Sequence, residues 1–215
     1  MKVIGCMATY EARAKTRKRA IDSIEPQLDE LHVIDNSWKG TKVDRADNAK
    51  FLALEGIKEP CFMFTLDDDL IYPPDYVAKT IAAIKEFGCI ITHHGRQLLG
   101  EGLHYYKGHR AFKCLEHVQN NEIVDVPGTG VTAFDTRYFH PKGLADSPDL
   151  RMSDLVFGLE AAKQKKQIGI ISHELGWIRH INNRETIYET ESRNGIRRQN
   201  EIADEIYRLN NKYNN

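Results

Sequence analysis

The sequence predicts an α/β fold built around a mainly parallel central sheet. Over roughly the first 93 residues, short apolar runs of strand length alternate with stretches of helical periodicity. Residues 1–36 read strand, helix, strand, which is the order and about the size of a βαβ unit. The chain has 215 residues, of which 41% are hydrophobic, and it contains no internal repeat or long linker. We therefore expect one domain that spans residues 1–215.

The elements expected in the first half follow from apolar runs and from residues that bound helices. Each predicted strand is a short apolar run that stops at polar turn residues. Pro26, Gly56 and Gly88 end the predicted helices, and Pro73-Pro74 precedes the third one. In chain order, we predict strand 2–9, helix 12–25, strand 31–34, helix 47–56, strand 61–66, helix 75–87 and strand 89–93.

The second half of the chain is less regular. Residues 94–125 are rich in Gly, His and Tyr, which predicts short strands or a flap. A tight loop, Pro127-Gly128-Thr129-Gly130, leads into an apolar strand. In chain order, we then predict strand 131–135, helix 153–165, strand 168–172 and a polar helix from about residue 197.

Polar residues follow three of the predicted strands, at the point where each strand ends. They are Thr9, Asp35 and the run Asp67-Asp68-Asp69. Right-handed crossovers bring the carboxyl ends of parallel strands to one edge of the sheet, and ligands bind beyond that edge. We therefore expect these residues to converge at a ligand site.

The run of three aspartates indicates a site for a divalent cation. Asp67, Asp68 and Asp69 repel one another, and Mn²⁺ or Mg²⁺ would neutralise them while bridging to phosphate. In an extended chain Asp67 and Asp69 point to one side and Asp68 to the other. The alternative is an acidic turn that caps the helix after Pro74. The position directly after a buried apolar strand favours the metal site.

Other polar residues have both a functional and a structural explanation. Asp35 could bind a nucleobase or a ribose, or it could be a turn residue. Lys50 and Arg13 could each meet a diphosphate, or they could lie on solvated surfaces. Asp154 could be a general base, or it could cap a helix. Gly128-Thr129-Gly130 could allow close approach of a sugar or acceptor, or it could be a plain turn.

Composition narrows the class of protein. The formal net charge of −1 gives no general reason to bind nucleic acid. The apolar N-terminal run is too short for a signal peptide, and no segment has the length of a membrane span. The four cysteines form no C-x-x-C pair, which favours buried free thiols over structural zinc. We expect a soluble, cytoplasmic protein.

The motifs occur in a specific order over about residues 1–185. They are Met7-Ala8-Thr9-Tyr10, residues 27–31, Asp35-Asn36, residues 47–51, residues 66–76, His94-Gly95, residues 128–131 and Met152-Ser153-Asp154. In that order they resemble the family 2 glycosyltransferases with the GT-A fold, especially a subgroup of short bacterial or phage-type enzymes. The resemblance implies a Rossmann-like three-layer sandwich. About residues 1–100 would bind the nucleotide sugar, about 101–185 would bind the acceptor and catalyse transfer, and 186–215 would form a helical extension.

The resemblance assigns residues to a donor site. Asp67 matches the first carboxylate of the D-x-D motif, near the ribose or the metal, and Asp68 lies between the two motif carboxylates. The Arg of the usual A-R-N segment is replaced by Asp47, so Lys50 is the candidate group near the diphosphate, with Arg13 as a further donor-site cation. The positions that hold the nucleotide base are matched by Ala8, Thr9, Tyr10 and Asp35.

The resemblance also implies a metal shell. Asp69 matches the ligand that bridges the metal to the diphosphate, with Asp67 as a second carboxylate. A histidine after a downstream strand completes the shell in the family, and counting along the chain places His180 at that position. His173 is the alternative. Trp177, which precedes His180, suits an active-site loop.

Asp154 matches the general base of inverting enzymes in this family. It is the second residue of an E-D pair that here reads Ser153-Asp154, so the first carboxylate is missing and acceptor binding could differ. Gly128, Thr129, Gly130 and Trp177 are the candidate acceptor-binding residues.

The sequence thus predicts a metal-dependent, inverting glycosyltransferase. It would move a sugar from a nucleotide-sugar donor, by family frequency a UDP-sugar, to a hydroxyl of a carbohydrate or another acceptor, modified DNA included. One alternative is a sugar nucleotidyltransferase, although residues 8–19 lack the glycines common in the N-terminal loop of that class. Another is a non-catalytic relative that binds nucleotide sugars.

Overall fold

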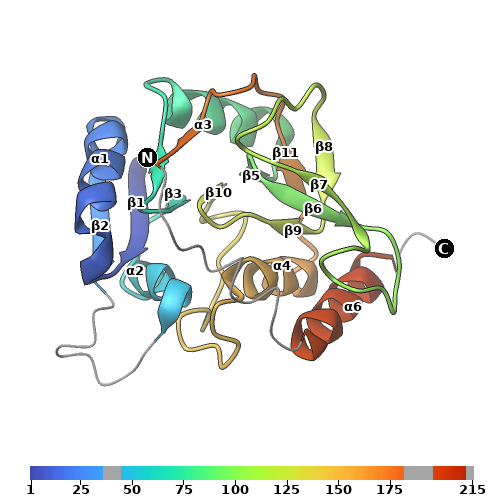
Figure 1. The fold of residues 1–215 in the computed structure, drawn as a ribbon. Coiled ribbons are helices and arrows are strands. Elements are labelled where there is room, and N and C mark those ends of the chain that lie inside the picture. Colours follow the sequence, from blue (N-terminus) through green and yellow to red (C-terminus); the bar gives the residue numbers. More distant parts are fainter. Residues whose placement is uncertain (36–44, 182–195, 212–215) are drawn as a thin grey trace.

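A central sheet crosses the middle of the molecule (Figure 1) in this computed structural model, which describes residues 1–35, 45–181 and 196–211. In those residues the sheet has seven strands. β1 pairs in parallel with β2 and β3, β5 pairs in parallel with β11, and only β10 and β8 run opposite to the others within the described sheet. Across the sheet the order is β2 (Glu30–Asp35), β1 (Lys2–Thr9), β3 (Cys61–Leu66), β10 (Val131–Asp135), β5 (Ile90–Thr92), β11 (Ile168–Ile170) and β8 (Glu122–Val124).

Helices cover both faces of this sheet. Figure 1 shows α3 (Tyr76–Phe87) and α4 (Ser153–Lys163) on opposite sides of it. α1 (Ala14–Ile24) shares a buried cluster with α3, whereas α2 (Leu52–Glu55) shares one with α4. Side chains of β3 alternate between the two clusters, as strand geometry requires. The predicted α/β class, with a Rossmann-like three-layer arrangement, is confirmed.

In the described part of the chain, two smaller sheets lie beside the central one. The segment 94–125 forms short strands, one of the two outcomes that its composition predicted. A three-stranded sheet joins β6 (Gly95–Leu98) to β7 (His109–Phe112) and to β9 (Val126–Pro127). A two-stranded ribbon pairs β4 (Leu70–Ile71) with β12 (Arg179–His180). That ribbon brings the segment after the acidic run against a strand more than a hundred residues later.

The C-terminal helix packs against the second half of the chain. α6 (Arg197–Asn211) lies against α4 and buries Ile202, Ala203 and Ile206 there. Strands on both sides of the expected boundary near residue 100 belong to one sheet, because β3 and β5 both pair with β10. Residues 186–195 and 212–215 of the predicted extension lie outside the described residues.

Element ends differ from the sequence prediction where the local backbone changes. Residues 47–56 contain a 3₁₀-helix, η3 (Ala46–Phe51), before the single turn of α2. α4 stops two residues early, because Lys165 takes a left-handed φ of 54° that a helix does not continue through. Gly88 ends α3 as predicted, with a φ of 62°. Short 3₁₀-turns flank α1 as η1 (Glu11–Arg13) and η2 (Glu25–Gln27).

Two features of the described chain bear on the compositional predictions. Cys6, Cys61, Cys89 and Cys114 are buried and unpaired, as the sequence predicted. Among the described helices, none combines the length and the apolar character that crossing a membrane requires.

Candidate functional site

The ends of β1, β2 and β3 meet at one edge of the central sheet. In the strand register Thr9 lies opposite Asp35, and Met7 lies opposite Leu66, the residue before the acidic run. All three strands run in the same direction, so the side chains that follow them emerge together. The predicted convergence of Thr9, Asp35 and Asp67 at one edge is therefore confirmed.

A buried lysine holds the first aspartate of the run. Lys50 Nζ lies 2.6 Å from Asp67 Oδ1 and 3.4 Å from the carbonyl oxygen of Thr129. The Lys50 side chain is 3% exposed and that of Asp67 is 43% exposed. Burial opposes the charge of Lys50, but Asp67 and Asp47 outweigh it and raise the pKa of Lys50. Lys50, predicted to meet a diphosphate, thus points at a carboxylate from inside the protein.

Gly130 leaves the space that the Asp67 carboxylate occupies. A Cβ atom at Gly130 would lie 1.9 Å from Asp67 Oδ2, far inside any permitted contact. The sequence assigned Gly130 to the acceptor, but its small size also lets the loop pass directly beside the acidic run.

The second aspartate is turned inward. Thr9 Oγ1 donates a 2.7 Å hydrogen bond to Asp68 Oδ2, and Asp68 is buried. Burial raises the pKa of Asp68 to about 6, against the hydrogen bond from Thr9 and with the neighbouring Asp67 adding to the rise. Asp68 therefore ties the acidic run to β1, and Asp67 and Asp69 carry the partly exposed carboxylates, in line with the predicted alternation.

The third aspartate faces an arginine and a histidine. Arg13 Nη1 donates to Asp69 Oδ2 at 2.9 Å, and His180 Nε2 lies 3.5 Å from the same oxygen. The β4–β12 ribbon positions His180 opposite Leu70, and Ile181 N donates to the Asp69 carbonyl at 2.7 Å. Of the two candidate histidines, His180 is the one beside Asp69.

His173 lies elsewhere. Its ring packs against His93 and Trp177, and its Nδ1 is 2.9 Å from the carbonyl oxygen of Ile171. These contacts place His173 on the α3 face of the sheet.

The predicted three-ligand metal shell is only partly assembled. In residues 1–35, 45–181 and 196–211, no three His, Cys, Asp or Glu side chains are grouped so as to hold a metal ion. Asp69 and His180 lie together, while Asp67 is directed at Lys50. A carboxylate and an imidazole fit an Mn²⁺ or Mg²⁺ ion that takes its other ligands from phosphate and water. Arg13 shares the Asp69 oxygen that such an ion would use.

Of the predicted base-binding residues, Thr9 is buried, whereas Ala8, Tyr10 and Asp35 reach solvent. Ala8 is partly exposed and Tyr10 is 42% exposed, so both can be reached by a ligand. Arg13 Nε donates to the Tyr10 hydroxyl at 3.1 Å, and its guanidinium lies 5.6 Å from the centre of that ring. Asp35 accepts from Arg17 Nη1 at 3.2 Å, and its side chain is half-exposed.

Asp154 is fixed by two donors from the glycine-rich loop. The backbone N–H and the Oγ1 of Thr129 each lie 2.8 Å from Asp154 Oδ1. Arg96 Nη1 lies 3.4 Å from Oδ2. Burial favours the neutral acid, but Arg96, Thr129 and the nearby His94 outweigh it and lower the pKa of Asp154. The carboxylate is therefore ionised at neutral pH.

Sequence reasoning missed Arg96, which neutralises Asp154. Its side chain is 11% exposed, donates to the Tyr105 hydroxyl at 3.0 Å and stacks over that ring at 5.4 Å. The sequence signal for Arg96 was a charged residue within a run of strand length. A charge on a strand that other elements cover needs a partner, because its burial is otherwise costly. Asp47 was also missed as part of this site.

The predicted acceptor-binding residues have different contacts in the described structure. Gly128 packs against the His94 side chain, and its N–H donates to the His94 carbonyl at 2.7 Å, next to the acidic run and Asp154. Trp177 instead donates from Nε1 to Asp75 Oδ1 at 3.0 Å, with Lys79 Nζ 5.1 Å from the ring centre.

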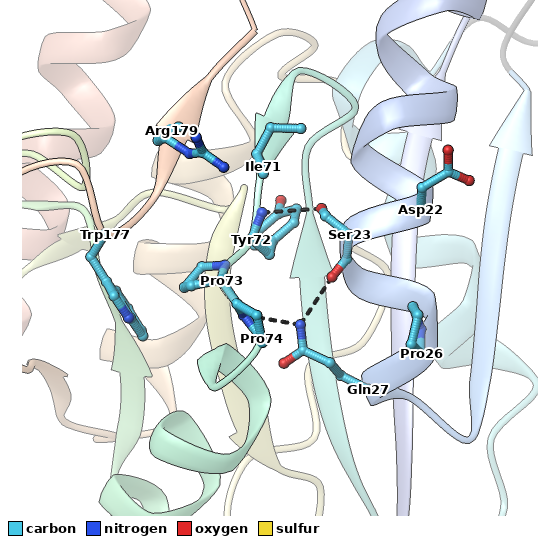
Figure 2. A pocket seen from close by; sticks show the side chains of 10 residues that line it. All are labelled: Asp22, Ser23, Pro26, Gln27, Ile71, Tyr72, Pro73, Pro74, Trp177 and Arg179. Carbon is cyan, nitrogen blue, oxygen red and sulfur yellow. Dashed lines mark hydrogen bonds between the residues drawn. The ribbon is translucent and has the colours of Figure 1, made fainter.

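Trp177 lines a groove whose walls do not include residues 128–130. The groove has a volume of about 550 Å³ and lies between the end of α1 and the chain around Pro73. Figure 2 shows Trp177 and Arg179 on one side of it and Ser23 and Gln27 on the other. The sequence made Trp177 an acceptor candidate because it precedes His180 and suits an active-site loop, and that position gives no information about which side chains it contacts.

No protein-family model matches the chain, and no curated protein matches it. Among solved structures, the protein A197 from STIV has 12% identity and a TM-score of 0.47, over 85% of this chain and 87% of that one. TarS 1-349 from S. aureus has 11% identity and a TM-score of 0.48, over 99% and 72%. An apo UDP-glucose pyrophosphorylase has 11% identity and a TM-score of 0.40, over 80% and 74%. Values this low carry no inference about substrate or reaction.

Proposed function

We propose that this protein is a glycosyltransferase that uses a nucleotide-sugar donor. The observation that carries the proposal is the position of Thr129 between two carboxylates. Its carbonyl oxygen accepts from Lys50, the partner of Asp67, and its N–H donates to Asp154. The edge that would bind the diphosphate and an ionised carboxylate thus adjoin across one buried residue, which is the arrangement that transfer from a diphosphate to a hydroxyl needs.

The donor would occupy the edge formed by the ends of β1, β2 and β3. Tyr10 and Asp35 are exposed there and can contact a base and a ribose. Arg13 offers a planar guanidinium, which suits the oxygens of a diphosphate. A divalent cation on Asp69 and His180 would supply Lewis-acid stabilisation of the leaving diphosphate. By family frequency, the donor is a UDP-sugar.

Asp154 would be the general base. Its Oδ1 is saturated by Thr129, whereas Oδ2 meets only the long contact from Arg96 among the hydrogen bonds of the described chain. Oδ2 is therefore the oxygen available to an acceptor hydroxyl. Removal of that proton, with attack from the side opposite the diphosphate, would invert the anomeric carbon.

A panel of nucleotide sugars tests the donor assignment. Thermal unfolding is measured with each compound, with and without Mn²⁺, since a ligand at about 100 times its Kd stabilises the fold by roughly 2.7 kcal/mol. The stabilising compound is then incubated with hydroxyl acceptors. Release of nucleoside diphosphate supports a glycosyltransferase, and release of pyrophosphate from a nucleotide and a sugar phosphate supports a nucleotidyltransferase. Binding without turnover supports a non-catalytic relative, and no stabilisation by any compound refutes the proposal.

A further inference from the structure

Two positions at which the chain departs from the family pattern lie in contact. Asp47 stands where the family has an arginine, and Ser153 stands where it has the first carboxylate of the pair. They are 106 residues apart, yet Asp47 Oδ2 lies 2.5 Å from Ser153 Oγ and 3.3 Å from Ser153 N. The carboxylate missing from position 153 is thus supplied by η3, at the N-terminus of α4, where negative charge is favourable.

The contact continues to Asp154 through a second hydroxyl. Ser153 Oγ lies 2.8 Å from Thr129 Oγ1, which lies 2.8 Å from Asp154 Oδ1. The chain Asp47, Ser153, Thr129, Asp154 therefore has three short oxygen contacts. Each hydroxyl carries one proton, and an ionised carboxylate carries none. While both carboxylates are ionised, two protons serve three contacts, and one contact lacks a proton.

Solvent has little access to this row of hydrogen-bonded side chains. Ser153 is 3% exposed and Thr129 is 2% exposed. Asp47 Oδ1 is buried and has no hydrogen-bond partner within the described part of the protein. A chain of this kind in a low-dielectric interior couples its ends strongly, because water does not screen it or supply the missing proton.

We propose that Asp47 is a positioning residue for Asp154, acting through Ser153 and Thr129 so that Thr129 turns its hydroxyl proton from Asp154 to Ser153 when Asp154 receives a proton. This inference rests on the proposed function. In the step, the acceptor O–H bond breaks and its proton goes to Asp154. The acceptor oxygen bonds the anomeric carbon, and the bond from that carbon to the diphosphate oxygen breaks with its electron pair on the diphosphate.

A proton on Asp154 Oδ2 leaves Oδ1 uncharged and a weaker acceptor, while Thr129 N–H still donates to it. Thr129 Oγ1 then donates to Ser153, and Ser153 donates to Asp47, which stays ionised. Asp47 thus favours the state in which the proton has been removed from the acceptor, although it touches neither substrate. Its loss should lower kcat and leave donor affinity unchanged.

The first test compares Asp47→Asn, Ser153→Ala and their double variant. We expect each single change to lower kcat about tenfold or more, with the donor Kd from calorimetry within about twofold of wild type. The double variant should be no slower than the slower single variant, because both act through one chain. Asp146→Asn is the control, since Asp146 is exposed and pairs only with Arg45 among its described ion pairs.

A second test exchanges the pair. Asp47→Arg and Ser153→Glu together place opposite charges at these two positions, whereas either change alone leaves a buried mismatch. We expect the double variant to be at least about tenfold more active than either single variant. Circular dichroism establishes that each variant is folded, and Asp47→Glu, which keeps the carboxylate, should recover activity relative to Asp47→Asn.

The outcomes separate this inference from the proposed function. No sugar transfer by the wild type refutes both. Transfer by the wild type with kcat of Asp47→Asn within twofold refutes the role of Asp47 alone. Multiplicative losses in the double variant Asp47→Asn/Ser153→Ala, or an exchanged pair no better than its single variants, also overturn it.

Discussion

Mild acid should destabilise the fold through one buried histidine. His93 ends the strand-length run after α3 and is fully buried, with Nε2 3.0 Å from Thr80 Oγ1. Its Nδ1 has no hydrogen-bond partner in the described structure. Burial, with His173 and Lys79 nearby, lowers the pKa of His93 to about 3 from the model-peptide value of 6.5. The ring is therefore neutral in the folded protein at any pH near neutrality.

The size of the effect follows from proton linkage. Between pH 6.5 and pH 3, the unfolded chain binds a proton at His93 that the folded protein does not bind. The free energy of unfolding therefore rises with pH across this window, by about 1.4 kcal/mol per pH unit. The contribution is fully present above pH 6.5, and about 2 kcal/mol of it is lost by pH 5.

Urea unfolding at pH 7.5 and pH 5.0 measures this loss in the wild type and in His93→Gln. Glutamine does not titrate in this range, and its amide can still bond to Thr80. Other titrating groups, such as His94 and Asp68, affect both proteins alike and cancel in the comparison. The pH-dependent loss should be about 2 kcal/mol smaller in His93→Gln. An equal loss in both proteins would show that His93 does not carry the linkage.

Three further predictions concern the candidate site. Asp154→Asn should lower sugar transfer by about 10²–10⁴-fold while the donor Kd measured by calorimetry is unchanged, and full activity would exclude Asp154 as the base. Asp69→Ala should weaken donor binding in the presence of Mn²⁺ by tenfold or more in the same assay; equal affinity with and without this carboxylate would remove it from the metal site. Gly130→Ala would bring a methyl group to 1.9 Å from Asp67 Oδ2 and force that carboxylate off Lys50. It should cost roughly 1–3 kcal/mol in urea unfolding, because the buried ammonium loses its partner, and an unchanged midpoint would contradict the importance of that pair.

The sequence predicted the sheet well because each strand is marked by residues that are close together in the sequence. Strands 61–66 and 131–135 have the predicted ends, since each is an apolar run stopped by aspartate or by a turn. Gly88 ends α3 because its own backbone takes a left-handed φ, which a glycine adopts easily. The convergence of strand ends at one edge followed from the parallel direction of β1, β2 and β3, which the alternation of strands and helices already implied.

These sequence patterns did not predict which side chains contact one another. Lys50 read as a solvated or phosphate-binding residue, but its position on η3, beneath the acidic run, buries it against Asp67. Trp177 has its described contacts with Asp75, Lys79 and His93 rather than with residues 128–130. The contact of Asp47 with Ser153 joins segments 106 residues apart, and neither helical nor strand periodicity carries information across that separation. Both residues were visible in the sequence only as departures from a family pattern.

Cationic side chains offset more of the site's negative charge than the sequence suggests. Arg13 and Asp69 illustrate this, because the guanidinium occupies the same carboxylate oxygen that lies 3.5 Å from His180. A diphosphate would bring negative charge to this point and, through bidentate hydrogen bonds, would attract the Arg13 guanidinium away from Asp69. That movement would free the oxygen for a divalent cation, and the cation would in turn offset the charge of the diphosphate. Donor and cation should therefore each raise the affinity of the protein for the other, by the same factor. The further ion pairs that balance the carboxylates of the site are Asp67 with Lys50 and Asp154 with Arg96.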